Sequence, residues 1–156
     1  KINNMATLTP TLTITSTDAF ANESFSLSVT DSLTVENPMS QLSRMRTGDN
    51  PFGHGAGVIL DETITTDTFV YVKHTGLLAS DGTTAANVSN DFIKLGNGDG
   101  DAASDIITLY PGEFAFFPVT KNNDTNDDGA EPGGLKVTAA SAAVLIEFCF
   151  WTRTAT

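Results

Sequence analysis

The feature that most constrains the fold of this chain is a series of short apolar segments separated by turn-forming residues. They are rich in β-branched and aromatic side chains, and clusters of Gly, Asn, Asp or Pro lie between them; the clearest are 68–76, 104–110, 112–120, 134–139 and 142–153. No stretch sustains the apolar 3.6-residue period of an amphipathic helix. The sequence therefore predicts an all-β protein.

The N-terminal part of the chain shows the same alternation with smaller side chains. Residues 7–17 alternate Thr with Leu or Ile, which would place Leu8, Leu12 and Ile14 on one side of a strand. Pro10 cannot donate to a strand ladder, so it indicates an edge strand or an arm. Residues 24–36 alternate in the same way, and we expect a bulge or turn at Asp31.

The alternation fails between residues 37 and 57, where two prolines and four glycines interrupt it. We expect an irregular segment here, with a single helical turn at 39–46. Arg44 and Arg46 are a close pair of basic residues in an otherwise acidic chain. The segment is either a solvated connection or an arm that docks on an acidic neighbouring surface through these arginines.

About eight strands in this rhythm fit an antiparallel β-sandwich of two sheets, in the manner of a jelly roll. A chain of 156 residues can bury one such core. We expect an N-terminal arm or edge strand at 1–17 and a sandwich domain at 18–156. We also expect two hairpins, 105–119 around a turn at 110–113 and 134–153 at the end of the chain.

The charge of the chain excludes several classes of partner. The net charge of −11 and the pI of about 4.2 disfavour nucleic acids and anionic membranes, because both require clustered Lys and Arg. No apolar run reaches the roughly 18 residues that a membrane-spanning helix needs. Self-association of so acidic a chain must depend on short-range apolar or hydrogen-bonded contacts.

Residues that could perform catalysis are few and scattered. His54 and His74 carry no metal-binding or nucleophile motif around them, and we expect His74 at the surface or an interface. The single cysteine, Cys149, lies in an apolar segment and reads as a buried small hydrophobe. The aromatic residues of the closing strands, including Phe114 and Phe116, are expected in the core. The sequence therefore predicts a protein that is not an enzyme.

One acidic loop has the spacing of a calcium site. Asp124, Asn126 and Asp128 are spaced like the first three ligands of an EF-hand loop. The twelfth position is Leu135, where an EF-hand has a bidentate Glu, so Glu131 would have to substitute in a looser site. Calcium is thus the one cofactor that the sequence suggests, and the alternative is a solvated turn.

The order of FVYVKHTG (69–76), DIITLYPGEFAFFPV (105–119), LKVTA (135–139) and AAVLIEFCFW (142–151) resembles small β-sandwich virion proteins of tailed bacteriophages. The resemblance covers about residues 68–153 and includes the Pro-Gly-Glu turn at 111–113. It implies a capsid decoration, or cement, protein that binds the major capsid protein on the capsid surface and stabilises the shell without catalysis.

Other functions remain open beside this one. They are a tail, fibre or neck component of the same virion, a calcium-dependent adhesion module, and an enzyme. For a virion protein we expect a homo-oligomer, with a trimer favoured. The contact residues would be Leu8, Leu12 and Ile14 of the arm together with Arg44 and Arg46.

Overall fold

The computed structural model describes residues 5–20, 23–36, 42–49, 56–60, 66–97, 105–119 and 134–153. These residues form strands and connections without a helix, so the predicted all-β class is confirmed. The strands are β1 (Met5–Leu8), β2 (Thr11–Phe20), β3 (Glu23–Thr30), β4 (Leu33–Glu36), β5 (Ser43–Arg46), β6 (Val58–Leu60), β7 (Thr68–Leu78), β8 (Ile93–Asn97), β9 (Asp105–Leu109), β10 (Phe114–Val119), β11 (Leu135–Ala139) and β12 (Val144–Arg153).

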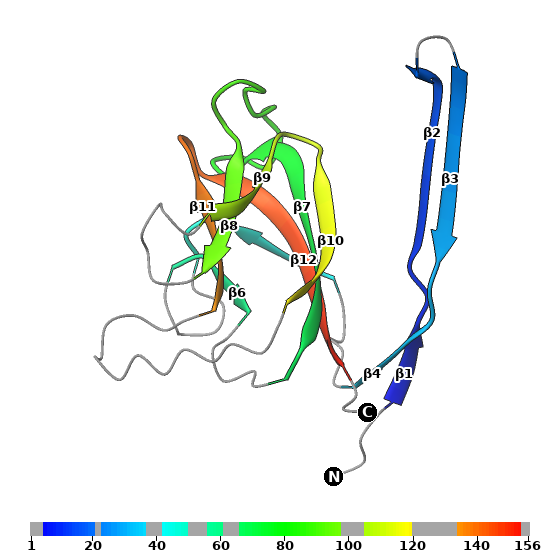
Figure 1. Cartoon of the computed structure of the whole chain (residues 1–156). Coiled ribbons are helices and arrows are strands. Elements are labelled where there is room, and N and C mark those ends of the chain that lie inside the picture. The colour runs from blue at the N-terminus through cyan, green and yellow to red at the C-terminus, as the bar shows by residue number, and fades with distance from the viewer. Residues whose placement is uncertain are drawn as a thin grey trace.

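The strands form three antiparallel sheets (Figure 1). The largest has the order β1-β4-β12-β7-β10, with β5 paired to β12. A second sheet has the order β6-β11-β8-β9, and β2 and β3 form a two-stranded ribbon. The described residues contain twelve strands where we expected about eight; the two N-terminal strands are each interrupted, and a short strand, β5, forms in the segment that we expected to be irregular. A two-sheet sandwich or jelly roll remains a prediction.

The hydrophobic core draws side chains from both larger sheets. Alternate residues of β7 and β12, such as Val70, Val72, Ile146 and Phe148, point to the same side of the six-stranded sheet, and each is at most 1% exposed. The four-stranded sheet contributes β6, β8, β9 and β11 through Ile59, Leu60, Ile93, Leu95, Leu109, Leu135 and Val137. The opposite side of the six-stranded sheet is therefore turned away from the core, and it is called the outer face below.

The two hairpins expected near the C-terminus are wrong, although one of their turns is correct. The Glu113 amide donates to the Tyr110 carbonyl at 2.9 Å, and Gly112 has a φ of 90°, as the predicted turn requires. The strands on either side nevertheless pair elsewhere, β9 with β8 and β10 with β7. In the same way β11 pairs with β6 and β8, whereas β12 belongs to the other sheet. Both connections pass from one sheet to the other.

The helical turn expected at 39–46 is wrong in the part that the structure describes. Residues 43–46 are strand β5, which pairs with β12 from Ser43–Phe148 to Arg46–Leu145. Met45 is buried, while Arg44 and Arg46 point to the outer face. Residues 37–41 and 50–55 lie outside the described residues.

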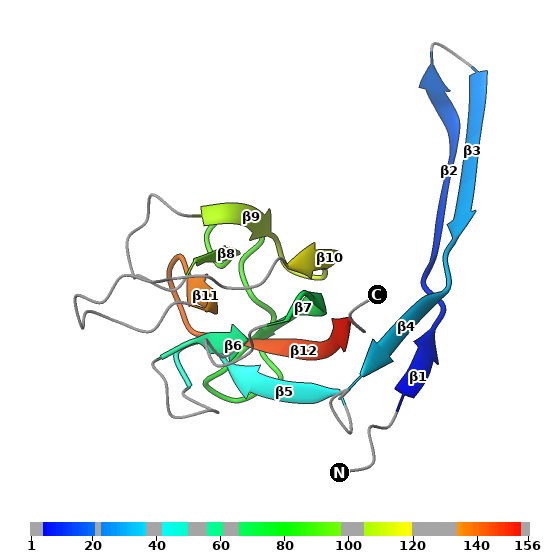
Figure 2. The same cartoon turned by 60° about the horizontal axis from the view of Figure 1, so that its bottom comes forward.

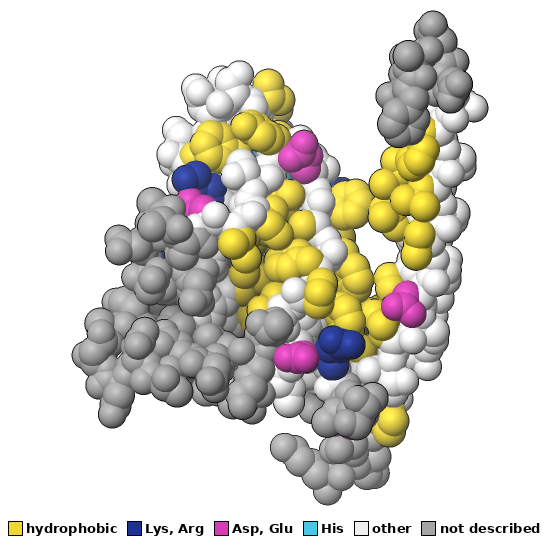
Figure 3. Space-filling model, viewed as in Figure 1, with side chains coloured by type: hydrophobic (Ala, Val, Ile, Leu, Met, Phe, Trp, Pro, Cys, Tyr) yellow, Lys and Arg dark blue, Asp and Glu magenta, His cyan; other side chains and the backbone are white. Residues whose placement is uncertain are grey.

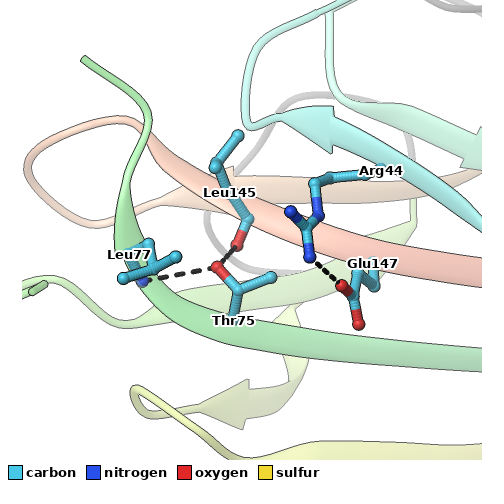
Figure 4. Close-up of polar contacts among 5 residues, drawn as sticks. All are labelled: Arg44, Thr75, Leu77, Leu145 and Glu147. Atoms are coloured by element: carbon cyan, nitrogen blue, oxygen red, sulfur yellow. Dashed lines mark hydrogen bonds and ion pairs between the residues drawn. The ribbon is translucent and has the colours of Figure 1, made fainter. Parts of the chain in front are cut away.

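The prediction that His74 lies at the surface or an interface is wrong. Its side chain is fully buried, with Nε2 donating to the Asp91 carbonyl at 2.6 Å and Nδ1 accepting from the Gly76 amide at 3.0 Å. Next to it the pairing of β7 and β12 changes register, and the Thr75 hydroxyl donates to the Leu145 carbonyl at 2.7 Å (Figure 4). These contacts satisfy polar groups that the irregular pairing would otherwise leave buried without partners.

Candidate interaction surfaces

Residues 5–20 pair antiparallel with residues 23–36, and we call these two segments together the arm. The β1–β4 and β2–β3 pairs keep a single register from Met5–Glu36 to Ser16–Phe25. The interruption between them falls at Pro10, which lacks an amide hydrogen but accepts a hydrogen bond from the Asp31 amide at 3.1 Å. The turn or bulge expected at Asp31 is therefore wrong, because the register continues through this residue. The boundary that we placed at residue 17 lies inside β2.

The arm stands out from the sheets and is attached to them at its base (Figures 1 and 2). There, β4 pairs with the end of β12 through Glu36–Thr152 and Val35–Arg153. The Thr152 hydroxyl also donates to the Glu36 carbonyl. Val35 is only 1% exposed, so the base is packed against the rest of the chain.

The two faces of the arm differ in chemistry. Paired residues share a face, so Leu12 and Val29 lie beside Ile14 and Leu27, and we call these four side chains the apolar stripe. They are 51%, 52%, 44% and 37% exposed, respectively. The opposite face is a ladder of hydroxyl side chains, formed by the pairs Thr11–Thr30, Thr13–Ser28 and Thr15–Ser26, with side-chain oxygen distances of 3.1 and 3.5 Å in the first two pairs.

The stripe points toward the outer face of the six-stranded sheet. In Figure 3 the hydrophobic side chains of the arm lie on the side turned toward the sheets. Leu8, which shares this side of the arm nearer the base, is partly buried. Burial therefore decreases from Val35 at the base to the stripe, where the side chains are well exposed.

The outer face carries an aromatic cluster across β7, β10 and β12. The Phe116 ring stacks on Phe69 at 5.8 Å and meets the edge of Trp151 at 6.3 Å, while Tyr71 lies 6.2 Å from Phe114 between ring centroids. Phe114 is 61% exposed and Phe116 is 37% exposed. Our expectation that these two phenylalanines lie in the core is therefore wrong, because Ala115 and Phe117 occupy the inward positions of β10.

Basic side chains surround this aromatic cluster. Strand alternation places Arg44, Arg46, Lys73 and Arg153 on the outer face, and these are four of the eight Lys and Arg residues in the chain. The Arg153 guanidinium lies 5.2 Å from the centroid of Phe69. The outer face is thus an aromatic area with four basic side chains, of which Arg44 is paired with Glu147 and Arg153 lies 4.0 Å from Asp67.

One of the predicted arginine anchors is already paired within the chain. Arg44 forms an ion pair with Glu147 of the neighbouring strand β12 (Figure 4). Burial, together with the charge of Glu147, raises the pKa of Tyr71 above its usual value of 10.0, so this phenol stays neutral near neutral pH. The other predicted anchor, Arg46, has an exposed side chain. The ion pair between Arg44 and Glu147 joins residues 103 positions apart, so local sequence could not indicate it.

The described part of the chain offers little support for a metal site, a ligand pocket or a membrane span. The four predicted calcium ligands, Asp124, Asn126, Asp128 and Glu131, lie outside the described residues. Within the described ranges, no three His, Cys, Asp or Glu side chains gather in a way that could hold a metal ion. A pocket of about 310 Å³ lies between β11 and the residues Thr47, Gly48 and Ala56. It is lined mainly by small residues, and Lys136 is the one ionisable side chain among those that line it. The described residues include no helix that could span a membrane.

The arm and the outer face are therefore the candidate interaction surfaces. Sequence reasoning found Leu12 and Ile14 through their alternation with threonine, but it did not find the aromatic outer face. Comparisons with protein-family models, curated proteins and solved structures gave no match for this chain.

Proposed function

We propose that this chain is a non-enzymatic structural protein that attaches to a larger assembly through its arm, and that it decorates the capsid of a tailed bacteriophage. The observation that carries the proposal is the apolar stripe on a projecting hairpin. The order of motifs between residues 68 and 153, which resembles phage virion proteins, supplies the choice of a capsid surface and of the major capsid protein as a partner.

A hairpin with this composition is suited to contact with a partner. An isolated two-stranded ribbon is marginally stable in water, and it gains stability when one face is covered. Contiguous exposed apolar side chains usually mark a site of association. Between Ala6 and Thr17, and between Ser24 and Thr30, the arm has no charged residue, so covering this part removes no charged group of the arm from water.

The size of the stripe indicates how tightly one arm could bind. Full burial of an aliphatic side chain is worth about 1.5–3 kcal/mol, and the four stripe residues are roughly half exposed, so covering them contributes about 3–6 kcal/mol per arm. Association of two proteins costs an estimated 4–15 kcal/mol in lost freedom of motion. A single arm therefore binds weakly, whereas many copies on a repeating surface bind together through avidity. This regime fits a protein that covers a shell.

The proposal is tested with undecorated heads of the phage that encodes the chain. Purified protein is sedimented with the heads and compared with a stripe variant, Leu12→Thr, Ile14→Thr, Leu27→Thr and Val29→Thr. Threonine keeps the preference for strand, so the variant removes apolar area with little change in backbone preference. The matched control changes the hydroxyl face of the same strands by Thr13→Ser, Thr15→Ser, Ser26→Thr and Ser28→Thr.

We expect the native chain and the control to bind heads, and the stripe variant to bind at least about tenfold more weakly, which corresponds to losing about 1.4 kcal/mol. Equal binding by all three proteins would show that the stripe is not the contact. Failure of the native chain to bind heads would refute the decoration role, and binding to tails instead would place the protein elsewhere on the virion.

A further inference from the structure

We propose that the apolar stripe of one copy covers the aromatic outer face of a second copy, so that copies of this chain close into a ring. The inference rests on the proposed function and deepens it, because it names the partner that the arm contacts. The oligomer, and not the single chain, would then be the unit that attaches to a shell.

The stripe and the outer face belong to one chain, and both leave apolar side chains exposed, with Phe114 at 61%. The pairing of β4 with both β1 and β12 fixes the base of the arm. Beyond that base the four stripe side chains remain 37–52% exposed. Each copy therefore presents one aliphatic and one aromatic surface, and both are incomplete without a partner.

Charge favours contact between an arm and an outer face over contact between two arms. Residues 5–36 of the sequence include four acidic residues, Asp18, Glu23, Asp31 and Glu36, and no basic one. Two arms packed stripe to stripe would therefore set two acidic segments against each other, and like charges in close contact oppose association. An arm laid on an outer face instead brings its acidic residues toward an area that holds half of the basic residues in the chain.

The orientation of the two surfaces also favours a ring. Within one copy the hydrophobic side chains of the arm are turned toward the sheets, and so toward the outer face of the sheet to which the arm is attached (Figure 3). A rotation about an axis perpendicular to the outer face keeps both directions, so every arm can lie over the outer face of the next copy. Such head-to-tail contacts close when the rotation closes, and each added copy brings the same contact.

The oligomeric state of the full chain in the absence of capsids tests this directly. We expect sedimentation velocity and native mass measurement to give a closed oligomer for the native chain and for the hydroxyl-face control defined above. The stripe variant should be mainly monomeric, and so should an outer-face variant, Phe114→Ser with Phe116→Ser. An oligomer that persists in the outer-face variant but is lost in the stripe variant would indicate that arms pair with arms, and it would overturn the proposal.

Cross-linking provides a readout that does not depend on loss of assembly. In a Cys149→Ser background, a Leu27→Cys chain is mixed with a Phe114→Cys chain of different mass and treated with a short bismaleimide. Links between the two kinds of chain should exceed links between two Leu27→Cys chains by at least about fivefold, because distance limits this reaction. Predominant Leu27→Cys self-links, or no links at all, would overturn the proposal.

The outcomes separate this inference from the proposed function. A native chain that forms the ring but does not bind phage heads would refute the decoration role and leave the ring intact. A native chain that binds heads but remains a monomer without cross-links would refute the ring and leave the decoration role intact.

Discussion

Gly57 offers the sharpest test of how closely the chain packs against Val137 of β11. Its φ is +80°, and a Cβ added there would lie 2.3 Å from the carbonyl oxygen of Val137. The same backbone makes two hydrogen bonds, from the Gly57 amide to the Asp49 carbonyl at 2.7 Å and from the Val137 amide to the Gly57 carbonyl at 2.9 Å. An alanine at this position would therefore strain the backbone and displace its neighbours.

The expected cost follows from these contacts. The left-handed conformation costs an L-residue about 1–2 kcal/mol. A methyl group fits only if residue 57 and the Val137 carbonyl move apart. This movement would weaken the hydrogen bonds of residue 57 to Asp49 and to Val137, each worth about 1 kcal/mol. We expect Gly57→Ala to lower the free energy of unfolding by about 3–4 kcal/mol and the melting temperature by roughly 10 °C.

Gly112→Ala is the matched control, because Gly112 also has a positive φ of 90° but no atom within 4 Å of the added Cβ. It should cost only the backbone term of about 1–2 kcal/mol. Equilibrium unfolding in urea, with both variants compared with the native chain, measures the difference. If Gly57→Ala destabilises the protein no more than Gly112→Ala does, the collision with Val137 is not real and the reasoning fails.

Two further predictions concern polar groups. Hydrogen bonds from Thr84 and Thr83 lower the pKa of Asp81 from 3.8 to about 2, so its contribution to stability is present above pH 3.8 and is lost as the pH falls through about 2. The native chain should thus melt higher than Asp81→Asn near neutral pH, with a difference that narrows in acid; a difference independent of pH would contradict this. Replacing His74 by Phe should cost about 2–4 kcal/mol in urea unfolding, because it leaves the Asp91 carbonyl without its donor, and a loss below about 1 kcal/mol would argue against that buried hydrogen bond.

Local patterns in the sequence predicted local structure well. The alternation of Thr with Leu and Ile predicted the strands of the arm, and Pro10 indicated an arm or an edge because a missing amide is readable from sequence alone. The turn at 110–113 followed from Pro111 and Gly112. Each of these features depends on neighbouring residues and on backbone chemistry.

Features that depend on distant residues could not be predicted. The period of two in β10 was visible, but Phe114 and Phe116 on one side and Ala115 and Phe117 on the other are all apolar, so the pattern did not say which side faces the core. A turn also fixes the direction of the chain without fixing which strands then pair, and for this reason both C-terminal hairpins were wrong.

Contacts with polar groups far along the chain also made two residues of the sequence analysis impossible to place correctly. His74 was expected at the surface or an interface because it is a polar residue on an alternating strand, yet its ring donates to a carbonyl 17 residues away. Arg44 looked available for a neighbour, yet Glu147 lies beside it across a strand pair. Register between distant strands decides such contacts, and composition or spacing does not reveal register.

The attachment of the arm at one end makes it a lever. The segment from Met5 to Phe20, which holds the four residues of β1 and the ten of β2, spans roughly 50 Å at about 3.3 Å per residue. A rotation of about 10° where β4 meets β12 would therefore carry the tip through roughly 9 Å, as follows from that length. Small adjustments at the base would let identical chains accommodate unequal distances between neighbours, as a curved lattice presents, without any change in the folded core.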